Sequence, residues 1–241
     1  MKYMGSKRRI ADEIIEVMLS IYNGCTFVDA FCGGCHVIEK VPITFRRIAN
    51  DKNVYLIEMW KALTNGETFQ QRIPKTLYDE VRDDWYKPTN EQQYNKAYIG
   101  WVGWMASCKG RFFDGGYSSH EASDGRDYIN EQIRGTLKQV PNLIGVEFQS
   151  VSYENLVVPE NSLIYCDIPY KNTKQYATSK DFDYEKFYDW CKMMTSKGHT
   201  VFISEYTMPE ENFDCVWSKE TKNSMSLKNT YQIIEKLWIP K

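Results

Sequence analysis

The chain has 241 residues, of which 42% are hydrophobic and 26% are charged, so it has room for one sizeable α/β domain or for one domain with an inserted module. Its net charge of −2 gives no direct support for a nucleic-acid partner, and residues 54–144 hold 11 basic against 12 acidic residues. No apolar run reaches the ~20 residues that cross a bilayer, the first residues lack a signal-peptide pattern, and the seven cysteines have no regular spacing. We therefore expect a cytoplasmic protein without a membrane segment or a disulfide framework.

The first sixty residues alternate between helical and strand patterns. Isoleucine and methionine residues at helical spacing predict an amphipathic helix, and a short apolar run after it predicts a buried strand. A glycine pair ends that strand, and a second helix and a second strand follow. The expected elements are a helix over 10–21, a strand over 26–31, a turn at 33–34, a helix from 37 and a strand over 47–50. This order predicts a parallel sheet with helices on its faces.

Regularity is lost between residues 66 and 142, where polar and aromatic stretches contain scattered glycines. The patterns beyond this segment predict strands over 145–148, 163–166 and 200–204, a helix over 184–196, and final strands over 213–217 and 231–239 joined by the polar loop 218–230. The final pair predicts an antiparallel hairpin at one edge of the sheet. We therefore expect a catalytic domain of residues 1–60 and 143–241, interrupted by an inserted domain over 61–142.

Two features of the first half suit a cofactor that contains a nucleoside. The strand that ends at Phe31 runs into Cys32-Gly33-Gly34-Cys35, and such a turn lets the backbone approach a ligand closely. The dinucleotide pattern G-x-G-x-x-G is not met, which disfavours NAD. Asp51 ends the next strand about twenty residues later, where a carboxylate can accept both hydrogens of a ribose hydroxyl pair. An ordinary turn and a helix cap are the alternatives for each feature alone.

The tetrapeptide Asp167-Ile168-Pro169-Tyr170 directly follows a predicted strand, at the end where α/β sheets place their active sites. The carboxylate of Asp167 can accept one hydrogen of an amino group, and a backbone carbonyl beside the proline can accept the other. Tyr170 provides a flat face on which an extruded base can stack. A strand that ends in a proline turn is the structural alternative.

Other chemistry-bearing residues receive no functional role. Cys32 and Cys35 have C-x-x-C spacing, but zinc would require a second pair, and a redox role would require both thiols to be exposed. His36, His120 and His199 are isolated in the sequence, which favours structural or surface roles over metal ligation. No metal is expected.

In their order along nearly the whole chain, these motifs resemble the Dam family of adenine-specific DNA methyltransferases, in its phage and prophage form. The similar segments are Tyr3-Met4-Gly5-Ser6-Lys7 (aromatic-x-Gly-x-Lys), 27–35 (Gly-rich cofactor loop), Asp51 (ribose-binding acid), 167–170 (Asp-Pro-Pro-Tyr) and Glu235-Lys236-Leu237-Trp238 (last strand). The resemblance implies a Rossmann-like sheet that binds S-adenosylmethionine. It also implies that the segment 61–142 is a mainly helical module that recognises double-stranded DNA.

The resemblance implies roles for individual residues. Cofactor contacts are implied for Tyr3, Lys7, Asp29, Phe31, Gly33, Gly34, Asp51, Tyr153 and Asp167, catalytic roles for Asp167, Ile168, Pro169 and Tyr170, and DNA contacts for Lys109, Arg111 and Tyr117. Basic side chains beside aromatic ones suit phosphate contact and base stacking. Two positions depart from the family pattern: Ser152 replaces an acid that often precedes the aromatic at 153, and Ile168 replaces the first proline. Because proline mainly restricts φ, we expect this change to loosen the loop without removing its carbonyl.

We therefore expect transfer of a methyl group from S-adenosylmethionine to the amino group of adenine in DNA, by direct in-line attack on the methyl after the base has left the duplex. Two alternatives stay open. The same tetrapeptide could serve the cytosine amino group, and an inactive DNA-binding relative is favoured by Ile168 and by the lack of excess positive charge. The resemblance allows a companion restriction endonuclease, and we expect a monomer or a weak dimer. The recognition sequence cannot be assigned, although GATC is common in the family.

Overall fold

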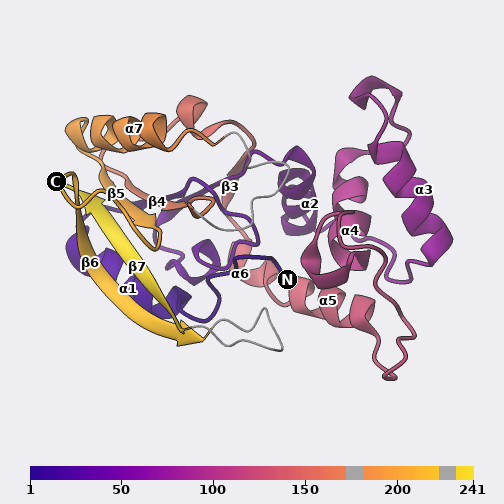
Figure 1. Cartoon of the computed structure of the whole chain (residues 1–241). Helices are drawn as coiled ribbons and strands as arrows, with labels where there is room; N and C mark the ends of the chain where they lie inside the picture. Colours follow the sequence, from indigo (N-terminus) through magenta and orange to yellow (C-terminus); the bar gives the residue numbers. More distant parts are fainter. Residues whose placement is uncertain (172–181, 223–231) are drawn as a thin grey trace.

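The computed structural model describes residues 1–171, 182–222 and 232–241, and within them seven strands form one sheet with helices on its faces (Figure 1). The strand order is β3-β2-β1-β4-β5-β7-β6. Strands β1 to β5 are parallel, and β7 pairs antiparallel with both β5 and β6. The strands are β1 (Thr26–Asp29), β2 (Arg46–Asn50), β3 (Glu147–Gln149), β4 (Leu163–Asp167), β5 (Thr200–Ser204), β6 (Phe213–Lys222) and β7 (Gln232–Pro240). The predicted α/β class and the antiparallel pairing of the last two strands are thus confirmed. Strand β6 extends beyond the predicted 213–217 into the segment expected to be a loop, and residues 223–231 of that expected loop and strand start lie outside the described residues.

The helices outside the segment 61–142 follow the predictions closely, with one exception. Helix α1 (Ala11–Ile21) and helix α7 (Tyr184–Ser196) lie where their patterns placed them. The helix expected from residue 37 was wrong, because the chain forms a single 3₁₀ turn, η1 (Ile38–Lys40). The backbone has positive φ at Gly33 and Cys35, and Pro42 forces the residue before it into an extended conformation, so there is no room for a helix.

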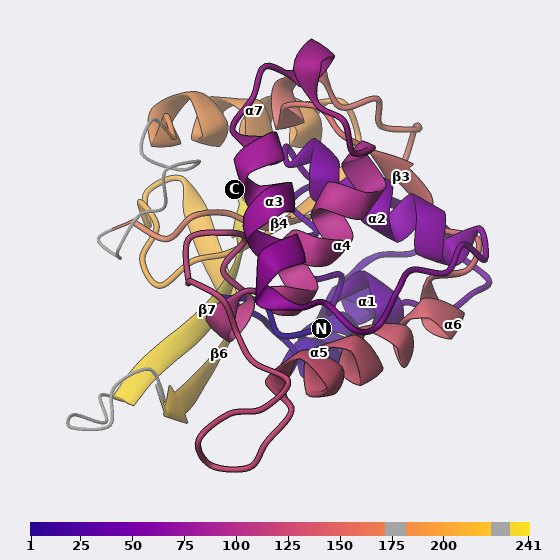
Figure 2. The ribbon, with the colours of Figure 1, turned by 90° about the vertical axis from the view of Figure 1, so that its right-hand side faces the viewer.

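Periodicity alone showed no regular elements over 66–142, and that reading was wrong, because the segment is largely helical, as the family resemblance implied. It contains the end of α2 (Val54–Thr64), then α3 (Lys75–Trp85), η2 (Thr89–Glu91), α4 (Lys96–Ala106), η3 (Cys108–Gly110), α5 (Tyr128–Leu137) and α6 (Val140–Leu143). Figure 2 views α3, α4 and α5 from their side of the molecule. Helix α4 is mostly buried, so it lacks the polar face that reveals a helical period. Gly100, which resembled a helix breaker, allows α2 to approach, since a Cβ there would lie 2.1 Å from the carbonyl oxygen of Tyr55.

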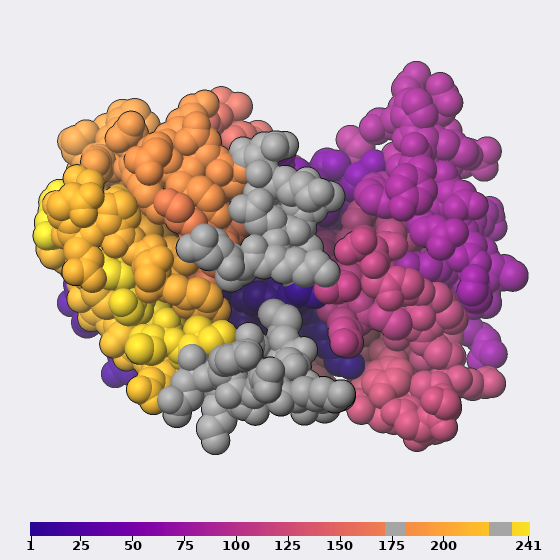
Figure 3. Space-filling model, viewed as in Figure 1, coloured from indigo at the N-terminus to yellow at the C-terminus, as the bar shows by residue number. Residues whose placement is uncertain are grey.

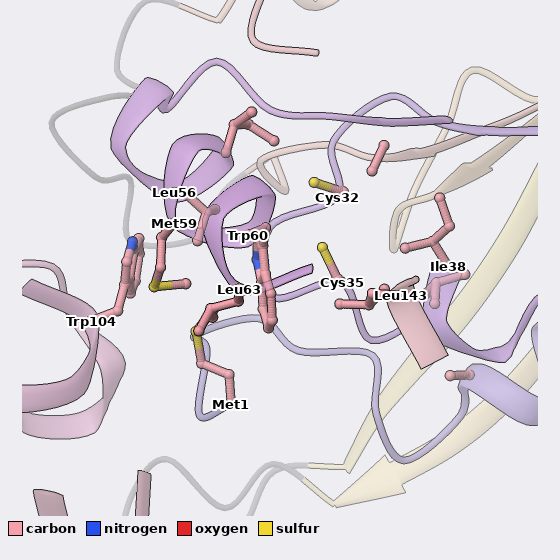
Figure 4. Packing of buried hydrophobic residues seen from close by; sticks show 14 of the residues in the cluster. Met1, Cys32, Cys35, Ile38, Leu56, Met59, Trp60, Leu63, Trp104 and Leu143 are labelled. Carbon is pink, nitrogen blue, oxygen red and sulfur yellow. The ribbon is translucent and has the colours of Figure 1, made fainter. Parts of the chain in front are cut away.

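Two buried clusters cover the two faces of the sheet. Successive residues of β1 point to opposite faces, so Phe27 belongs to one cluster and Val28 to the other. The larger cluster continues from α1 and the sheet through Trp60 of α2 to Trp104 of α4, as Figure 4 shows for part of it. The second cluster lies under α7. The helices of the middle segment therefore share a core with the sheet. Among the described residues, no helix is both long and apolar enough to cross a membrane.

Candidate active site

Acidic residues gather where the strand order changes direction. From β1 the chain moves outward to β2 and β3, and then returns to place β4 on the other side of β1. In such sheets ligands bind outside the carboxyl ends of the strands at this switch point. Asp29 ends β1, Asp51 follows β2, and Asp167 ends β4. The structure therefore brings three sequence-predicted residues to one edge of the sheet.

Asp51 ties the glycine loop to the end of β2. Its Oδ2 accepts a hydrogen bond from the Gly33 N–H at 3.1 Å, and its Oδ1 accepts one from Asn53 at 2.8 Å. Burial raises the pKa of Asp51, and these backbone hydrogen bonds oppose that rise. Each carboxylate oxygen can accept more than one hydrogen bond, so this role is compatible with the predicted binding of a ribose.

Tyr3, the first residue in the chain with an implied cofactor contact, covers the glycine loop. The ring of Tyr3 lies against Gly33, where an added Cβ would come within 2.6 Å of it, and the Tyr3 Cβ lies against Gly34, where an added Cβ would come within 2.8 Å. Gly33 also has a backbone φ of +44°, which residues other than glycine rarely adopt. On its other side, the Tyr3 ring packs against Trp104 of α4 with centroids 5.0 Å apart. Tyr3 thus links the loop to the helices.

Asp29 is a buried carboxylate with an unsatisfied oxygen. Its side chain is only 1% exposed, and Oδ1 has no hydrogen-bond partner among the residues that the structure describes. Burial raises the pKa of Asp29 well above its usual range, and the nearby Asp167 raises it further. Burying such an atom without a partner costs free energy, so its retention at the switch point suits a ligand that carries a donor or a positive charge.

Lys7 supplies a positive charge to this acidic edge. The side chain is 6% exposed, and its Nζ lies 3.0 Å from Oδ1 of Asp167 and 3.9 Å from Oε2 of Glu235 on β7. The same ammonium lies over the Tyr170 ring, 4.4 Å from the ring centroid. Burial raises the pKa of Asp167, whereas Lys7 lowers it, so this ion pair favours the ionised carboxylate.

Tyr170 is oriented by groups on two strands. Its hydroxyl donates a hydrogen bond to Oε2 of Glu235 at 3.0 Å. Its ring meets that of Tyr206, which follows β5, in an edge-to-face arrangement with centroids 4.3 Å apart. The ring therefore has a defined orientation beside Asp167, as a surface for base stacking requires.

Residues 167–171 include the four residues that the sequence predicts to be catalytic and are called the catalytic loop below for that reason. They are anchored in ways that the sequence did not reveal. The Ile168 side chain is 3% exposed and packs into the cluster under α7. The carbonyl oxygen of Pro169 accepts a hydrogen bond from the Tyr184 hydroxyl at 2.9 Å. We expected isoleucine at 168 to loosen the loop, but its buried side chain anchors the loop to the cluster under α7.

Phe31 and Tyr153 lie together as parts of an aromatic cluster. Their ring centroids are 5.7 Å apart, and Tyr153 also meets Trp190 of α7 at 5.2 Å. Both are partly exposed and lie beyond the carboxyl ends of β1 and β3. This position is compatible with the cofactor contacts that the resemblance implies.

The three predicted DNA-contacting residues have different surroundings. Lys109 is exposed, and Arg111 is partly buried with an Nε that has no hydrogen-bond partner within the described part of the chain. Tyr117 is engaged in packing, because its hydroxyl donates to the Ile73 carbonyl at 2.8 Å and its ring meets Tyr78. Figure 3 shows a hollow between the sheet and the helices, with indigo residues of the N-terminal part at its floor.

The residues without an assigned role are structural. Cys32 and Cys35 are both buried, so the exposure that a redox pair would need is not met. His36 hydrogen-bonds the carbonyl of Met1, His120 contacts Asp127 and the Ile73 N–H, and His199 accepts from the Ser162 N–H.

Sequence reasoning missed two carboxylates of this site, Glu205 and Glu235. Glu205 directly follows β5, so the rule that selected Asp51 and Asp167 could have found it. Glu235 was noted as part of a strand motif, but its direction depends on the pairing of β7, for which the sequence contains no local signal.

The sheet and its acidic edge are consistent with the fold of a methyltransferase. Residues 3–99 match the family model described as D12 class N6 adenine-specific DNA methyltransferase. Over this segment the chain is similar to the Dam-type family that the motifs predicted. The matched segment contains Tyr3, Lys7, the glycine loop and Asp51, and the catalytic loop lies beyond it. No curated protein matches the chain.

Proposed function

We propose that this protein transfers a methyl group from S-adenosylmethionine to the exocyclic amino group of adenine in double-stranded DNA. The observation that carries the proposal is the meeting of Lys7, Asp167 and Tyr170 at the switch point, with the Lys7–Asp167 ion pair at 3.0 Å. The match of residues 3–99 to an adenine-specific family supports adenine over cytosine.

The residues at the edge of the sheet fit the cofactor. S-adenosylmethionine carries an ammonium group, a ribose and a sulfonium, and when bound it supplies an electrophilic methyl group. The unsatisfied oxygen of Asp29 suits a cationic group, and Asp51 suits the ribose hydroxyls. Phe31 and the glycine loop, covered by Tyr3, would enclose the methionine part, with Tyr153 near the adenine.

The catalytic loop would act on the base through hydrogen bonding and positioning. Because Oδ1 of Asp167 faces Lys7, we assign Oδ2 to one hydrogen of the adenine amino group and the Ile168 carbonyl to the other. These two acceptors favour the pyramidal nitrogen that has a lone pair available for attack. Tyr170 would hold the extruded base, so catalysis rests on orientation and local electrostatics.

Residues 61–142 are the segment that we assign to DNA recognition. Lys109 and Arg111 lie in the loop that begins at η3, and the Cβ position of Gly110 in this loop is 2.2 Å from the Lys2 carbonyl oxygen. The loop therefore adjoins the segment that carries Tyr3, and its basic side chains are available to phosphates near the catalytic loop.

The test is transfer of labelled methyl to unmethylated mixed-sequence DNA, followed by base analysis. We expect label in N6-methyladenine with the wild type and with Asp12→Ala, an exposed acid on α1, and none with Asp167→Ala. Label in N4-methylcytosine would replace adenine by cytosine as the substrate. Cofactor binding without any transfer by the wild type would establish an inactive DNA-binding relative instead.

A further inference from the structure

Glu205 joins the end of β5 to the catalytic loop. The residue is fully buried, with 0% of its surface exposed. Its Oε2 accepts a hydrogen bond from the backbone N–H of Lys171 at 2.8 Å, and its Oε1 accepts one from the N–H of Tyr206 at 2.6 Å. Lys171 directly follows Tyr170, so one carboxylate fixes the backbone on both sides of the Tyr170–Tyr206 ring contact.

The backbone of Glu205 is itself held in place. The indole N–H of Trp238 on β7 donates to the Glu205 carbonyl at 2.9 Å. The carboxylate contacts neither Asp167 nor the position assigned to the adenine amino group, and it bonds to the chain next to Tyr170. Its hydrogen bonds therefore act on the orientation of Tyr170 and of the loop backbone, and its charge also acts on Lys7.

We propose that the ionised Glu205 carboxylate is a positioning residue that locks the catalytic loop in its reactive conformation. The proposal rests on the proposed function, because it assumes that Tyr170 receives the base. Isoleucine at 168 lacks the ring that would fix the loop's φ, so the loop depends on other anchors. A misplacement of about 1 Å can lower a rate by roughly a hundredfold, which makes such an anchor valuable.

The ionisation of Glu205 makes this lock sensitive to pH. A carboxylate accepts hydrogen bonds at both oxygens, whereas the protonated acid uses one oxygen as a hydroxyl and loses acceptor capacity. Burial raises the pKa of Glu205 to about 7, although its backbone hydrogen bonds and Lys7 lower it. The other titratable groups that its charge acts on are Tyr188 on α7 and Tyr206. Glu235 on β7 and Asp167 act in turn on Tyr206, and the backbone of Lys171 bonds directly to the Glu205 carboxylate.

Activity and stability should consequently respond to pH in opposite directions. Because the pKa of this acid is higher in the folded state than in the unfolded chain, its contribution to the free energy of unfolding falls as pH rises toward 7. The lock forms over the same pH range, so the methyl-transfer rate rises. A residue that only stabilised the fold would make both quantities change together.

The experiment compares the wild type with Glu205→Gln and with Val201→Ala, which removes buried volume from the same strand but no carboxylate. The measurements are kcat at saturating cofactor and DNA from pH 5.5 to 8.5, the cofactor dissociation constant, and hydrogen-exchange protection of the Lys171 amide. For Glu205→Gln we expect a roughly tenfold lower kcat at pH 8, loss of the rate increase near pH 7, weaker Lys171 protection, and cofactor affinity within about twofold of wild type. Val201→Ala should lose stability and keep the wild-type pH profile.

An unchanged pH profile in Glu205→Gln, or equal Lys171 protection in both proteins across pH 7, would overturn the proposal. Failure of the proposed function is recognisable separately, because the wild type would then transfer no methyl group to DNA. In that case the amide protection of Lys171 in the wild type and in Glu205→Gln still decides whether the carboxylate holds the loop.

Discussion

Replacing Lys7 by methionine removes the positive charge beside Asp167 and keeps a side chain of similar length. In the wild type Nζ lies 3.0 Å from Oδ1 of Asp167, and Glu235 lies 3.9 Å away. At 3.0 Å, Coulomb's law gives an attraction of roughly 1.4 kcal/mol in water and roughly 5.5 kcal/mol at an effective dielectric constant of about 20. The true value lies between these limits, because Lys7 is buried while the Asp167 side chain is 22% exposed.

We take a loss of about 2–3 kcal/mol, below the ~3–5 kcal/mol that is typical when one partner of a fully buried ion pair is removed. At 1.36 kcal/mol per factor of ten, this corresponds to a roughly 30- to 150-fold lower rate of methyl transfer at neutral pH. Without Lys7 the pKa of Asp167 rises further, because burial is then less opposed. Since the reaction requires the ionised carboxylate, the rate of the variant should recover partly as pH increases.

The assay is methyl transfer to DNA at saturating cofactor across pH 6 to 9, with cofactor affinity and thermal unfolding measured in parallel. Lys40→Met is the matched control, because Lys40 also lies 3.0 Å from a carboxylate, that of Asp12, but both side chains are exposed. Its effect on stability should stay below about 1 kcal/mol, with no change of rate. A wild-type rate and pH profile in Lys7→Met would refute the assignment of Lys7 as the group that keeps Asp167 ionised.

Two further variants test the edge of the sheet. Asp29→Asn should raise the free energy of unfolding of the cofactor-free protein by about 1 kcal/mol, with the gain largest at high pH, because burial raises the pKa of the carboxyl and the amide cannot ionise. Cofactor affinity should fall, and thermal unfolding with and without cofactor measures both effects. An unchanged affinity would count against this cofactor contact. Tyr170→Phe keeps the ring but loses the hydrogen bond to Glu235, so its methyl-transfer rate should fall a few-fold. Tyr170→Ala should lose about 1–3 kcal/mol of base stacking. Fluorescence of 2-aminopurine at the target position reports stacking, and equal signals from both variants would exclude Tyr170 as the stacking surface.

The sequence was informative where chemistry depends on local position. A carboxylate next to the end of a buried strand lies at the carboxyl edge of a parallel sheet whatever the rest of the chain does. Asp51 and Asp167 could therefore be selected from strand patterns alone, and the structure brings them to the same edge. The helix at 184–196 and the strand at 200–204 were equally clear because their apolar residues follow one period.

Contacts between distant segments could not be predicted in this way. The ion pair of Lys7 with Asp167 and the hydrogen bond of Tyr170 to Glu235 depend on how the strands are ordered and paired. The individual helices of the middle segment, which the resemblance implied only as a group, could not be located from periodicity for a different reason. Helix α4 is buried on nearly all sides, so its sequence has no polar face, and its glycine at 100 serves close helix packing.

The switch point also has a consequence for the order in which the protein folds. Strand β1 pairs with β2 shortly after it in sequence, but its other neighbour, β4, follows only after the whole helical segment. Closing so long a loop is entropically costly, and non-local parallel pairing forms slowly. During synthesis the first two strands and the helices leave the ribosome before β4 exists. We therefore expect Asp29 and Asp167 to come together late in folding, so that the acidic edge forms after β1, β2 and the helices of the middle segment have been made.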